Sequence, residues 1–271
     1  MEIKFFCPHW GSKHLDFIEF ALNVKRSGYD GVEMSLPLDP SEKGIILGIL
    51  NDHDLLFIAQ HWETITIDFE EHKSEYRQRL INLATAKPLF INSQTGKDFF
   101  TFDQNAELIG IAKEISKKYG IRIVHETHRG KFSFASHITA DYIKRIPDLE
   151  IGFDVSHWCN VAESYLADQP ENIELAISRA AHIHARVGFP EGPQVPDPRD
   201  PEWEEAVSIH LAWWKRIVER NRAEDRPVFT ITSEFGPFPY MTILPFTLQP
   251  ISNQWDINIY MMNMLKTEFS Q

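Results

Sequence analysis

Residues 122–157, RIVHETHRGKFSFASHITADYIKRIPDLEIGFDVSH, contain a strand–helix–strand pattern. The apolar and β-branched run at Arg122–His125 is typical of a strand. Ile138–Ile146 has the apolar spacing of a helix, which Pro147 then ends. A second strand pattern follows at Glu150–Asp154. This order predicts a parallel pair of strands joined by a crossover helix.

The same alternation runs through the rest of the chain. Further strand patterns occur at Ile3–Pro8, Gly31–Ser35, Leu55–Gln60, Leu89–Ser93, His182–Arg186 and Val228–Ser233. Helical patterns occur at Leu15–Arg26, Ser41–Asn51, Phe69–Ala86, Asn105–Lys118, Asn172–Ala180, Trp203–Arg222 and Trp255–Leu265, the last with Ser252 as its expected cap. Eight strands that alternate with eight helices predict an α/β fold, a single-domain (β/α)8 TIM barrel over residues 1–271.

The composition limits the partners of the protein. A formal net charge of −12 without any Lys/Arg-rich run disfavours nucleic acid. No segment approaches the roughly 20 apolar residues that a membrane span requires. The two cysteines, Cys7 and Cys159, form no metal-binding spacing and are consistent with a reducing cytoplasm. We therefore expect a cytoplasmic protein that binds neither nucleic acid nor membrane.

Acids and histidines gather at the carboxyl ends of the last four predicted strands. They are found in His125-Glu126-Thr127-His128, Asp154-Val155-Ser156-His157, His182-Ile183-His184-Ala185-Arg186 and Ser233-Glu234-Phe235-Gly236. The carboxyl ends of barrel strands share one mouth, so three carboxylates and an imidazole would meet there. Without a compensating positive charge this is strongly unfavourable. The sequence thus predicts one divalent metal ion bound by Glu126, Asp154, His184 and Glu234, with Mn²⁺ or Mg²⁺ favoured over Co²⁺ or Zn²⁺.

The first four strands offer weaker candidates. Glu33, His61, Trp62 and Gln94 lie at or after strand ends, and so do His9 and Trp10. They could bind a sugar at the rim, although rim packing explains them almost as well. The loops Phe189–Pro201 and Gly236–Pro250 follow late strands and either line the site or form plain surface.

With these motifs the chain resembles the xylose isomerase-like sugar phosphate isomerase/epimerase superfamily, which includes ketose 3-epimerases, inosose dehydratases and endonuclease IV-type nucleases. The resemblance spans the whole chain as an order of strands. It implies that the four predicted ligands hold the metal. It also implies that His157 and Arg186 contact substrate, although Arg186 follows the strand-seven histidine more closely than in ketose epimerases. His128, which shares a strand face with Glu126, joins this set with His61 and Glu33.

The implied function is a metal-dependent isomerase or epimerase acting on a small sugar or sugar phosphate through an enediolate. A metal ion that holds two adjacent oxygens of the substrate would acidify the carbon-bound proton, and Glu126 and Glu234 would exchange it as an acid/base pair. A dehydratase of the inosose type shares this first step and is the alternative. An endonuclease IV-like phosphodiesterase is disfavoured, because its extra histidine after strand four is replaced by Asn92-Ser93-Gln94. A barrel that binds without turnover is also open, and an exposed Trp213-Trp214 pair would suit a homo-oligomer contact.

Overall fold

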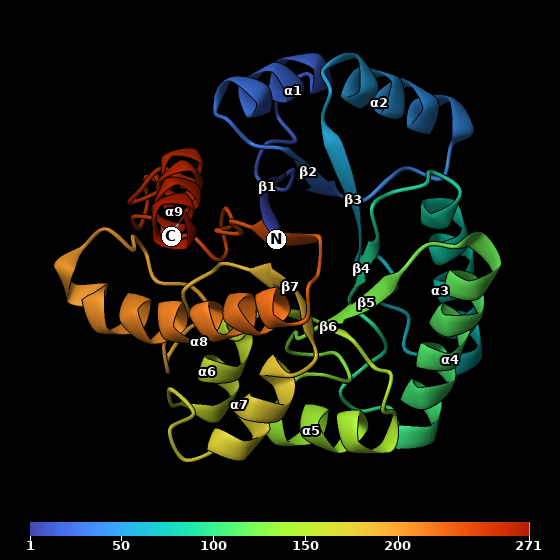
Figure 1. Ribbon diagram of the computed structural model, residues 1–271. Helices are drawn as coiled ribbons and strands as arrows, with labels where there is room; N and C mark the ends of the chain where they lie inside the picture. The colour runs from blue at the N-terminus through green and yellow to red at the C-terminus, as the bar shows by residue number, and fades with distance from the viewer. Residues whose placement is uncertain (271) are drawn as a thin grey trace.

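The computed structural model describes residues 1–270 and confirms the predicted barrel. Eight parallel strands follow one another around a closed sheet, and β1 pairs with β8 to close it. Figure 1 shows the helices as a ring around the strands. The strands are β1 (Glu2–Pro8), β2 (Gly31–Met34), β3 (Leu56–His61), β4 (Ile91–Ser93), β5 (Ile123–Glu126), β6 (Ile151–Phe153), β7 (Ala180–His184) and β8 (Val228–Thr232).

The seventh strand lies two residues earlier than the sequence pattern predicts. It spans Ala180–His184 rather than His182–Arg186, so that prediction was wrong. Ala180 pairs with Ile151 of β6, and the register then shifts at Gly152. Alanine has a low strand propensity, which is why the start of β7 gives little signal in the sequence. Arg186 consequently lies beyond the strand, in the loop that leads to α8.

Every predicted helix is present, and one unpredicted helix, α6, follows β6 directly. Its seven residues are too few for a helical period to be visible in the sequence. The helices are α1 (Phe17–Arg26), α2 (Pro40–Asp52), α3 (Phe69–Ala84), α4 (Phe102–Tyr119), α5 (Ser136–Arg145), α6 (Ser156–Ala162), α7 (Pro170–Ile177), α8 (Glu204–Ala223) and α9 (Gln254–Phe269), with a 3-10 turn η1 (Pro201–Trp203) before α8.

Two local predictions about the helices were wrong. The N-cap of α9 is Asn253, whose side chain accepts the amide of Asp256, whereas the Ser252 hydroxyl donates to Asp197. The indoles of Trp213 and Trp214 are not exposed, since these residues are 8% and 0% accessible. Both lie in the wide face of α8 that packs on the barrel, so they offer no subunit contact.

The barrel interior changes from apolar to polar along its axis. Its lower layer contains Phe6, Ile58, Phe90, Val124 and Ala181, which form a separate buried cluster. Residues two positions apart on a strand face the same side. The polar side chains of Gln60, Asn92 and Glu126 therefore stand directly above the apolar residues Ile58, Phe90 and Val124. The barrel interior is therefore lined with polar side chains at the carboxyl ends of the strands.

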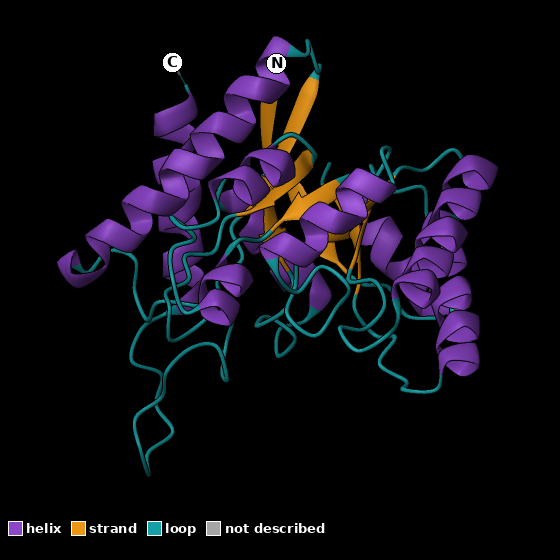
Figure 2. Cartoon of the chain, turned by 90° about the horizontal axis from the view of Figure 1, so that it is seen from below, coloured by secondary structure: helices purple, strands orange, loops and turns teal. Residues whose placement is uncertain are grey.

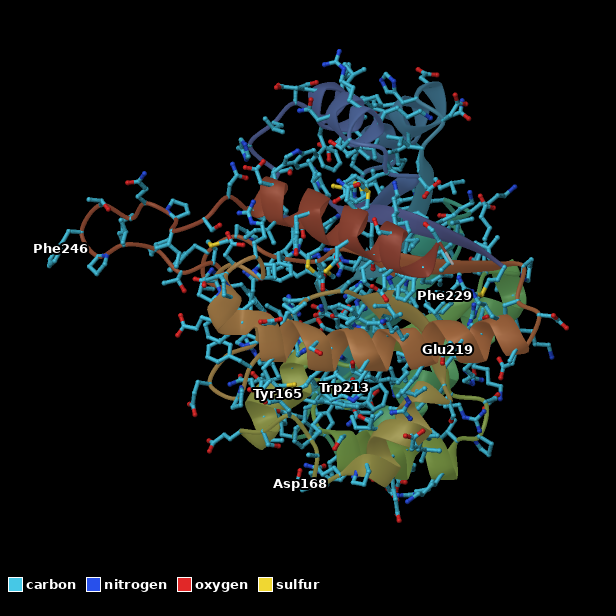
Figure 3. The ribbon with its side chains drawn as sticks, turned by 60° about the vertical axis from the view of Figure 1, so that its left-hand side comes forward. Tyr165, Asp168, Trp213, Glu219, Phe229 and Phe246 are labelled. Atoms are coloured by element: carbon cyan, nitrogen blue, oxygen red, sulfur yellow. The ribbon has the colours of Figure 1, made fainter. Side chains whose placement is uncertain are left out.

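The loop after β8 forms a long arm that projects from the barrel (Figures 2 and 3). Its two limbs are joined by an antiparallel bridge between Ile243 and Pro250, and Phe246 is fully exposed near its tip. At the base of the arm, Tyr240 turns back to the mouth of the barrel, where it lines the main cavity. Among residues 1–270 no helix combines the length and apolar character needed to cross a bilayer.

Candidate metal centre

The structure brings the four predicted metal ligands together. Glu126 and His184 are the last residues of β5 and β7, while Asp154 and Glu234 come one and two residues after β6 and β8. One ligand atom of each lies within 4.8 Å of the ligand atoms of the others. All four residues are buried. The carboxyl ends of four consecutive strands thus form one compact cluster of three carboxylates and one imidazole.

The free atoms of this cluster fit a divalent ion. Nδ1 of His184 lies 2.7 Å from Oε2 of Glu234, yet within residues 1–270 neither atom takes part in a well-directed hydrogen bond. Oε1 of Glu126 is 3.8 Å from the same nitrogen. Lone pairs that converge without bonding to each other are the arrangement that ligands of a common cation adopt. Oxygen ligands with one imidazole are suited to hard or borderline divalent ions.

Asp154 has a second neutralising partner. The Arg186 guanidinium contacts its carboxylate and donates through Nε to Ser156 Oγ at 3.1 Å and through Nη2 to His157 Nε2 at 2.7 Å. The amide of Ser156 also donates to Asp154 at 3.1 Å. Arg186 thus supplies one of the positive charges that the buried acids require, whereas from the sequence we assigned all of that charge to a metal ion. The same Nη2 of Arg186 lies 3.8 Å from Glu234 Oε2.

The two glutamates differ in their proton affinity. Burial raises the pKa of Glu126 to about 8, and neighbouring Glu234, Asp154 and Glu33 contribute in the same direction against His184. Burial also raises the pKa of Glu234, but His184 and Arg186 outweigh it and leave this pKa below its usual value. Burial lowers the pKa of His184, yet the surrounding carboxylates hold it well above its usual value. The protonated form of Glu126 is therefore favoured at neutral pH, whereas Glu234 is favoured as the carboxylate.

Each glutamate is oriented by a neutral amide from another strand region. Gln94 Nε2 donates to Glu126 Oε1 at 3.1 Å, and Gln60 Nε2 donates to Glu234 Oε1 at 3.1 Å. Asn92 Nδ2 adds a second donor to Glu126, at 3.2 Å from Oε2. These amides hold the carboxylates in place without adding charge. Sequence reasoning missed Gln60 and Asn92, whose only signal is a polar residue that follows apolar residues near the carboxyl end of its strand.

A cavity of about 550 Å³ opens onto the cluster. Glu126, Glu234, Arg186 and His128 line its inner end, whereas Asp154 and His184 lie behind them, outside its lining. The cavity is long enough to reach α2 at Ile46. Its walls include four aromatic residues that could stack on a ring, namely His9, Trp10, Trp62 and Tyr240. Tyr240 was not predicted individually, because only the fold returns the base of the uncharged arm to the mouth.

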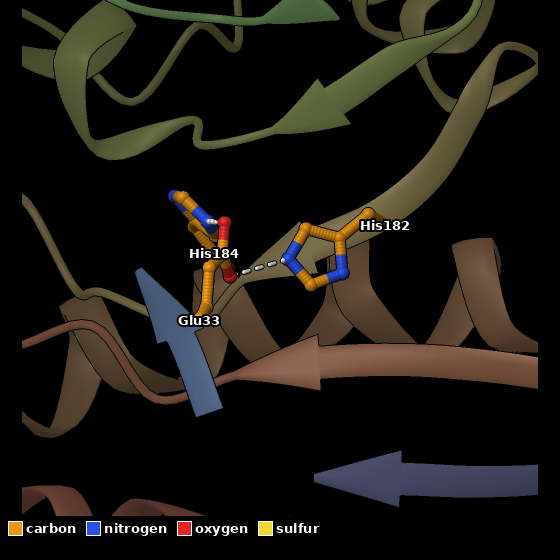
Figure 4. A group of neighbouring side chains, drawn as sticks. All are labelled: Glu33, His182 and His184. Carbon is orange, nitrogen blue, oxygen red and sulfur yellow. Dashed lines mark hydrogen bonds and ion pairs between the residues drawn. The ribbon is translucent and has the colours of Figure 1, made fainter. Parts of the chain in front are cut away.

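Three residues expected at the substrate lie elsewhere. His61 is fully buried on the outer face of β3, where its ring nitrogens bond to Ser93 Oγ at 3.0 Å and Thr64 Oγ1 at 2.8 Å. His157 is fully buried beside Arg186, and its ring lies against that of His128 at a tilt of 51°, with centroids 3.9 Å apart. Glu33 is buried inside the barrel below the cluster, beside His182 and His184 (Figure 4). None of the three lines the cavity.

The chain matches no family model and no curated protein in sequence. Solved structures match it over nearly its whole length. A 3-keto-D-glucoside 4-epimerase from E. coli has a TM-score of 0.64 and 13% identity, covering 98% of this chain and 100% of that one. A probable 3-DHS dehydratase involved in petrobactin synthesis from Bacillus anthracis has a TM-score of 0.61 and 16% identity, covering 97% and 98%.

Endonuclease IV from Thermus thermophilus is similar in the same way, with a TM-score of 0.59, 12% identity and coverage of 100% and 99%. Chains described as xylose isomerase domain proteins, from Salmonella typhimurium and Planctomyces limnophilus among others, match with TM-scores of 0.64 and 0.60. Identities this low show only the architecture, and different chemistries are found on it. In architecture, this chain is a (β/α)8 TIM barrel similar to these solved structures.

Proposed function

We propose that this protein is a divalent-metal-dependent isomerase or epimerase of a small sugar or sugar phosphate. The observation that carries the proposal is the position of Glu126 and Glu234. Both face the cavity from strand ends on either side of the two other ligands, Asp154 and His184, which lie behind them. A bound substrate would therefore contact one carboxyl group with a raised pKa and one with a lowered pKa, next to a cluster suited to a cation.

The reaction requires a proton to be moved at a carbon atom next to a carbonyl. A divalent ion at the cluster would supply the positive charge that acidifies such a proton and stabilises the resulting enediolate. One glutamate removes the proton as general base, and the other returns it from the opposite side as general acid. Arg186, buried at the inner end of the cavity, can donate to the developing oxyanion. Carboxyl groups with separated pKa values are suited to this exchange.

A dehydratase is the second candidate, because elimination of a β-hydroxyl starts with the same proton removal. The fold is similar to that of a probable dehydratase and to that of an epimerase, so it is compatible with either reaction. The wall of aromatic side chains that lines the cavity would serve either substrate.

The test is solvent exchange on defined substrates. The protein is loaded with Mn²⁺, its metal content is measured, and it is incubated in D₂O with ketoses, inososes and their phosphates. We expect one bound metal and deuterium at the carbon next to the carbonyl, with an epimer as product; an unsaturated product would select the dehydratase. No exchange together with cleavage of abasic DNA would overturn the proposal in favour of a phosphodiesterase.

A further inference from the structure

The buried carboxylate of Glu33 has no role in the mechanism above and yet lies against a metal ligand. It is 1% accessible and does not line the cavity. Its Oε1 accepts from His184 Nε2 at 2.9 Å and from Asn92 Nδ2 at 3.0 Å. Its Oε2 accepts from His182 Nε2 at 3.1 Å and from the Thr232 hydroxyl. Figure 4 shows the carboxylate between the two imidazoles.

These contacts make the Glu33 carboxylate a fully used hydrogen-bond acceptor rather than part of a second metal site. Each carboxylate oxygen already receives two hydrogen bonds, and the nitrogen-to-oxygen distances are those of hydrogen bonds. The surrounding groups are donors, which would repel a cation placed among them. The ligand atoms of Glu33, His182 and His184 lie close enough together to hold a metal ion, but the two Glu33 oxygens also accept hydrogen bonds from Asn92 and Thr232.

The bond from His184 to Glu33 decides which ring nitrogen is free. A carboxylate only accepts, so the proton of the bond belongs to Nε2 of His184. Asn92 Nδ2 lies 3.0 Å from the same nitrogen, but both of its protons are used in the hydrogen bonds to Glu33 and Glu126. In the neutral ring the lone pair is then on Nδ1. Nδ1 is the nitrogen that points at the cluster, 2.7 Å from Glu234 Oε2. Without an acceptor at Nε2, the ring proton could instead move to Nδ1 and bond to Glu234.

Glu33 also links this histidine to a second ligand. The Nδ2 group of Asn92 donates both to Glu33 Oε1 and to Glu126 Oε2, at 3.0 and 3.2 Å. The links therefore join β2, β4, β5 and β7 across the barrel interior. Hydrogen-bond partners of this kind orient metal-ligating imidazoles and carboxylates and raise the basicity of the imidazole.

We infer that Glu33 is a positioning residue for the metal centre: it holds the proton of His184 on Nε2, so that Nδ1 is presented to the ion, and through Asn92 it fixes Glu126. The inference rests on the proposed metal site. It assigns Glu33 no contact with substrate, in place of the substrate contact expected from the sequence.

The direct test is the protonation of His184 in the unmodified protein. Long-range ¹H–¹⁵N NMR of the Zn²⁺-loaded, ¹⁵N-histidine-labelled protein should show a proton on Nε2 and metal coordination through Nδ1. Coordination through Nε2, or an unprotonated Nε2, would overturn the inference. This measurement does not depend on turnover, so it separates the inference from the proposed reaction.

Variants add a quantitative readout. Glu33→Leu removes the acceptor, and calorimetry should show Mn²⁺ binding weakened by about 10- to 100-fold. Glu33→Gln keeps the volume and one acceptor oxygen, so its affinity should lie between those of Glu33→Leu and the unmodified protein. Should Glu33→Leu fail to fold, the weaker binding of Glu33→Gln remains the criterion, and unchanged Mn²⁺ affinity in a folded Glu33 variant contradicts the inference.

A matched control removes a paired carboxylate far from the site. Glu150 lies before β6, at the other end of the barrel, and pairs with Arg122 at 2.6 Å and Arg226 at 3.2 Å. Glu150→Gln should lower stability but leave Mn²⁺ affinity unchanged. If the unmodified protein binds no metal at all, the proposed function fails; if it binds and turns over while the Glu33 variants bind equally well, only the positioning role fails.

Discussion

His184 Nδ1 and Glu234 Oε2 approach to 2.7 Å without the direction of a hydrogen bond. The opposite nitrogen of the same ring bonds to Glu33 at 2.9 Å. The His184 ring is thus hydrogen-bonded through Nε2, whereas within residues 1–270 its Nδ1 has no hydrogen-bond partner. A buried lone pair with no partner is costly unless an ion or proton satisfies it. The function we propose for the barrel depends on this relationship. Five predictions test the roles of the residues in and around the cluster.

Replacing Glu234 by glutamine should abolish turnover without unfolding the protein. The amide cannot act as a general base, and loss of a positioned base costs about 10²- to 10⁴-fold in rate. The measurement is deuterium exchange into substrate, with circular dichroism as the check on folding. Glu42→Gln, on the exposed face of α2, is the control and should exchange at the normal rate. An active Glu234→Gln variant would remove this residue from the acid/base pair.

Metal affinity should increase with pH. Below about 8 the Glu126 carboxyl of the metal-free protein holds a proton, because burial raises its pKa to about 8. Binding must displace that proton, and this displacement alone should lower Kd for Mn²⁺ by about tenfold per pH unit up to that point. The raised pKa of His184 adds a second displaced proton, so the fall in Kd should be steeper where both groups are protonated. Calorimetry in buffers of different ionisation enthalpy measures the protons released; a flat affinity between pH 6 and 8 would contradict the assignment.

The same shift affects the stability of the metal-free protein. The pKa of Glu126 is raised in the folded state above its ordinary value of 4.5. Its protonated form therefore contributes stability that is complete below pH 4.5 and is lost as pH rises through about 8. Mn²⁺ should consequently raise the melting temperature more at pH 8 than at pH 6, as thermal unfolding with and without a chelator can measure.

Arg186→Ala should destabilise the protein strongly. It would leave Asp154 buried without its cation, and breaking a buried pair in this way costs about 3–5 kcal/mol. Arg186→Lys should restore only part of the loss, since an ammonium cannot contact Asp154, Ser156 and His157 with the fixed fork of a guanidinium. Urea unfolding gives the values.

The control for Arg186 is Arg77→Ala, which breaks an exposed pair with Glu114 at 3.2 Å. Exposed pairs contribute about 0–1 kcal/mol, so this change should be small. Equal losses for the buried and the exposed arginine would mean that Asp154 does not depend on Arg186.

Gly152→Ala should weaken metal binding, although Gly152 is not one of the four candidate ligands. A Cβ atom at Gly152 would overlap the Asn92 amide, which bonds to Glu33 and Glu126. We expect a loss of about 1–3 kcal/mol, typical of overpacking, together with weaker Mn²⁺ binding. Gly110→Ala on α4 is the matched change, since nothing lies within 4 Å of its added methyl group. It should stabilise the helix by about 0.5–1 kcal/mol; a similar loss in both variants would contradict this explanation.

Local sequence patterns were enough to predict the barrel and the clustering of the four candidate ligands. Alternating strand and helix patterns are local, and parallel strands in a barrel bring their carboxyl ends to one mouth. A carboxylate or imidazole at the end of a strand can therefore be placed without knowing its contacts. This reasoning located Glu126, Asp154, His184 and Glu234, and it failed where a strand began with weak propensity, as at Ala180.

The burial of each candidate residue and its contacts could be read from the folded structure alone. Glu33 and His61 both come from strand ends, yet Glu33 points into the barrel and His61 points outward to α3. Arg186 neutralises Asp154 although 32 residues separate them. The Trp213-Trp214 pair is buried by packing of α8 on the barrel. Such contacts depend on barrel closure and on the packing of distant elements, which no local pattern encodes.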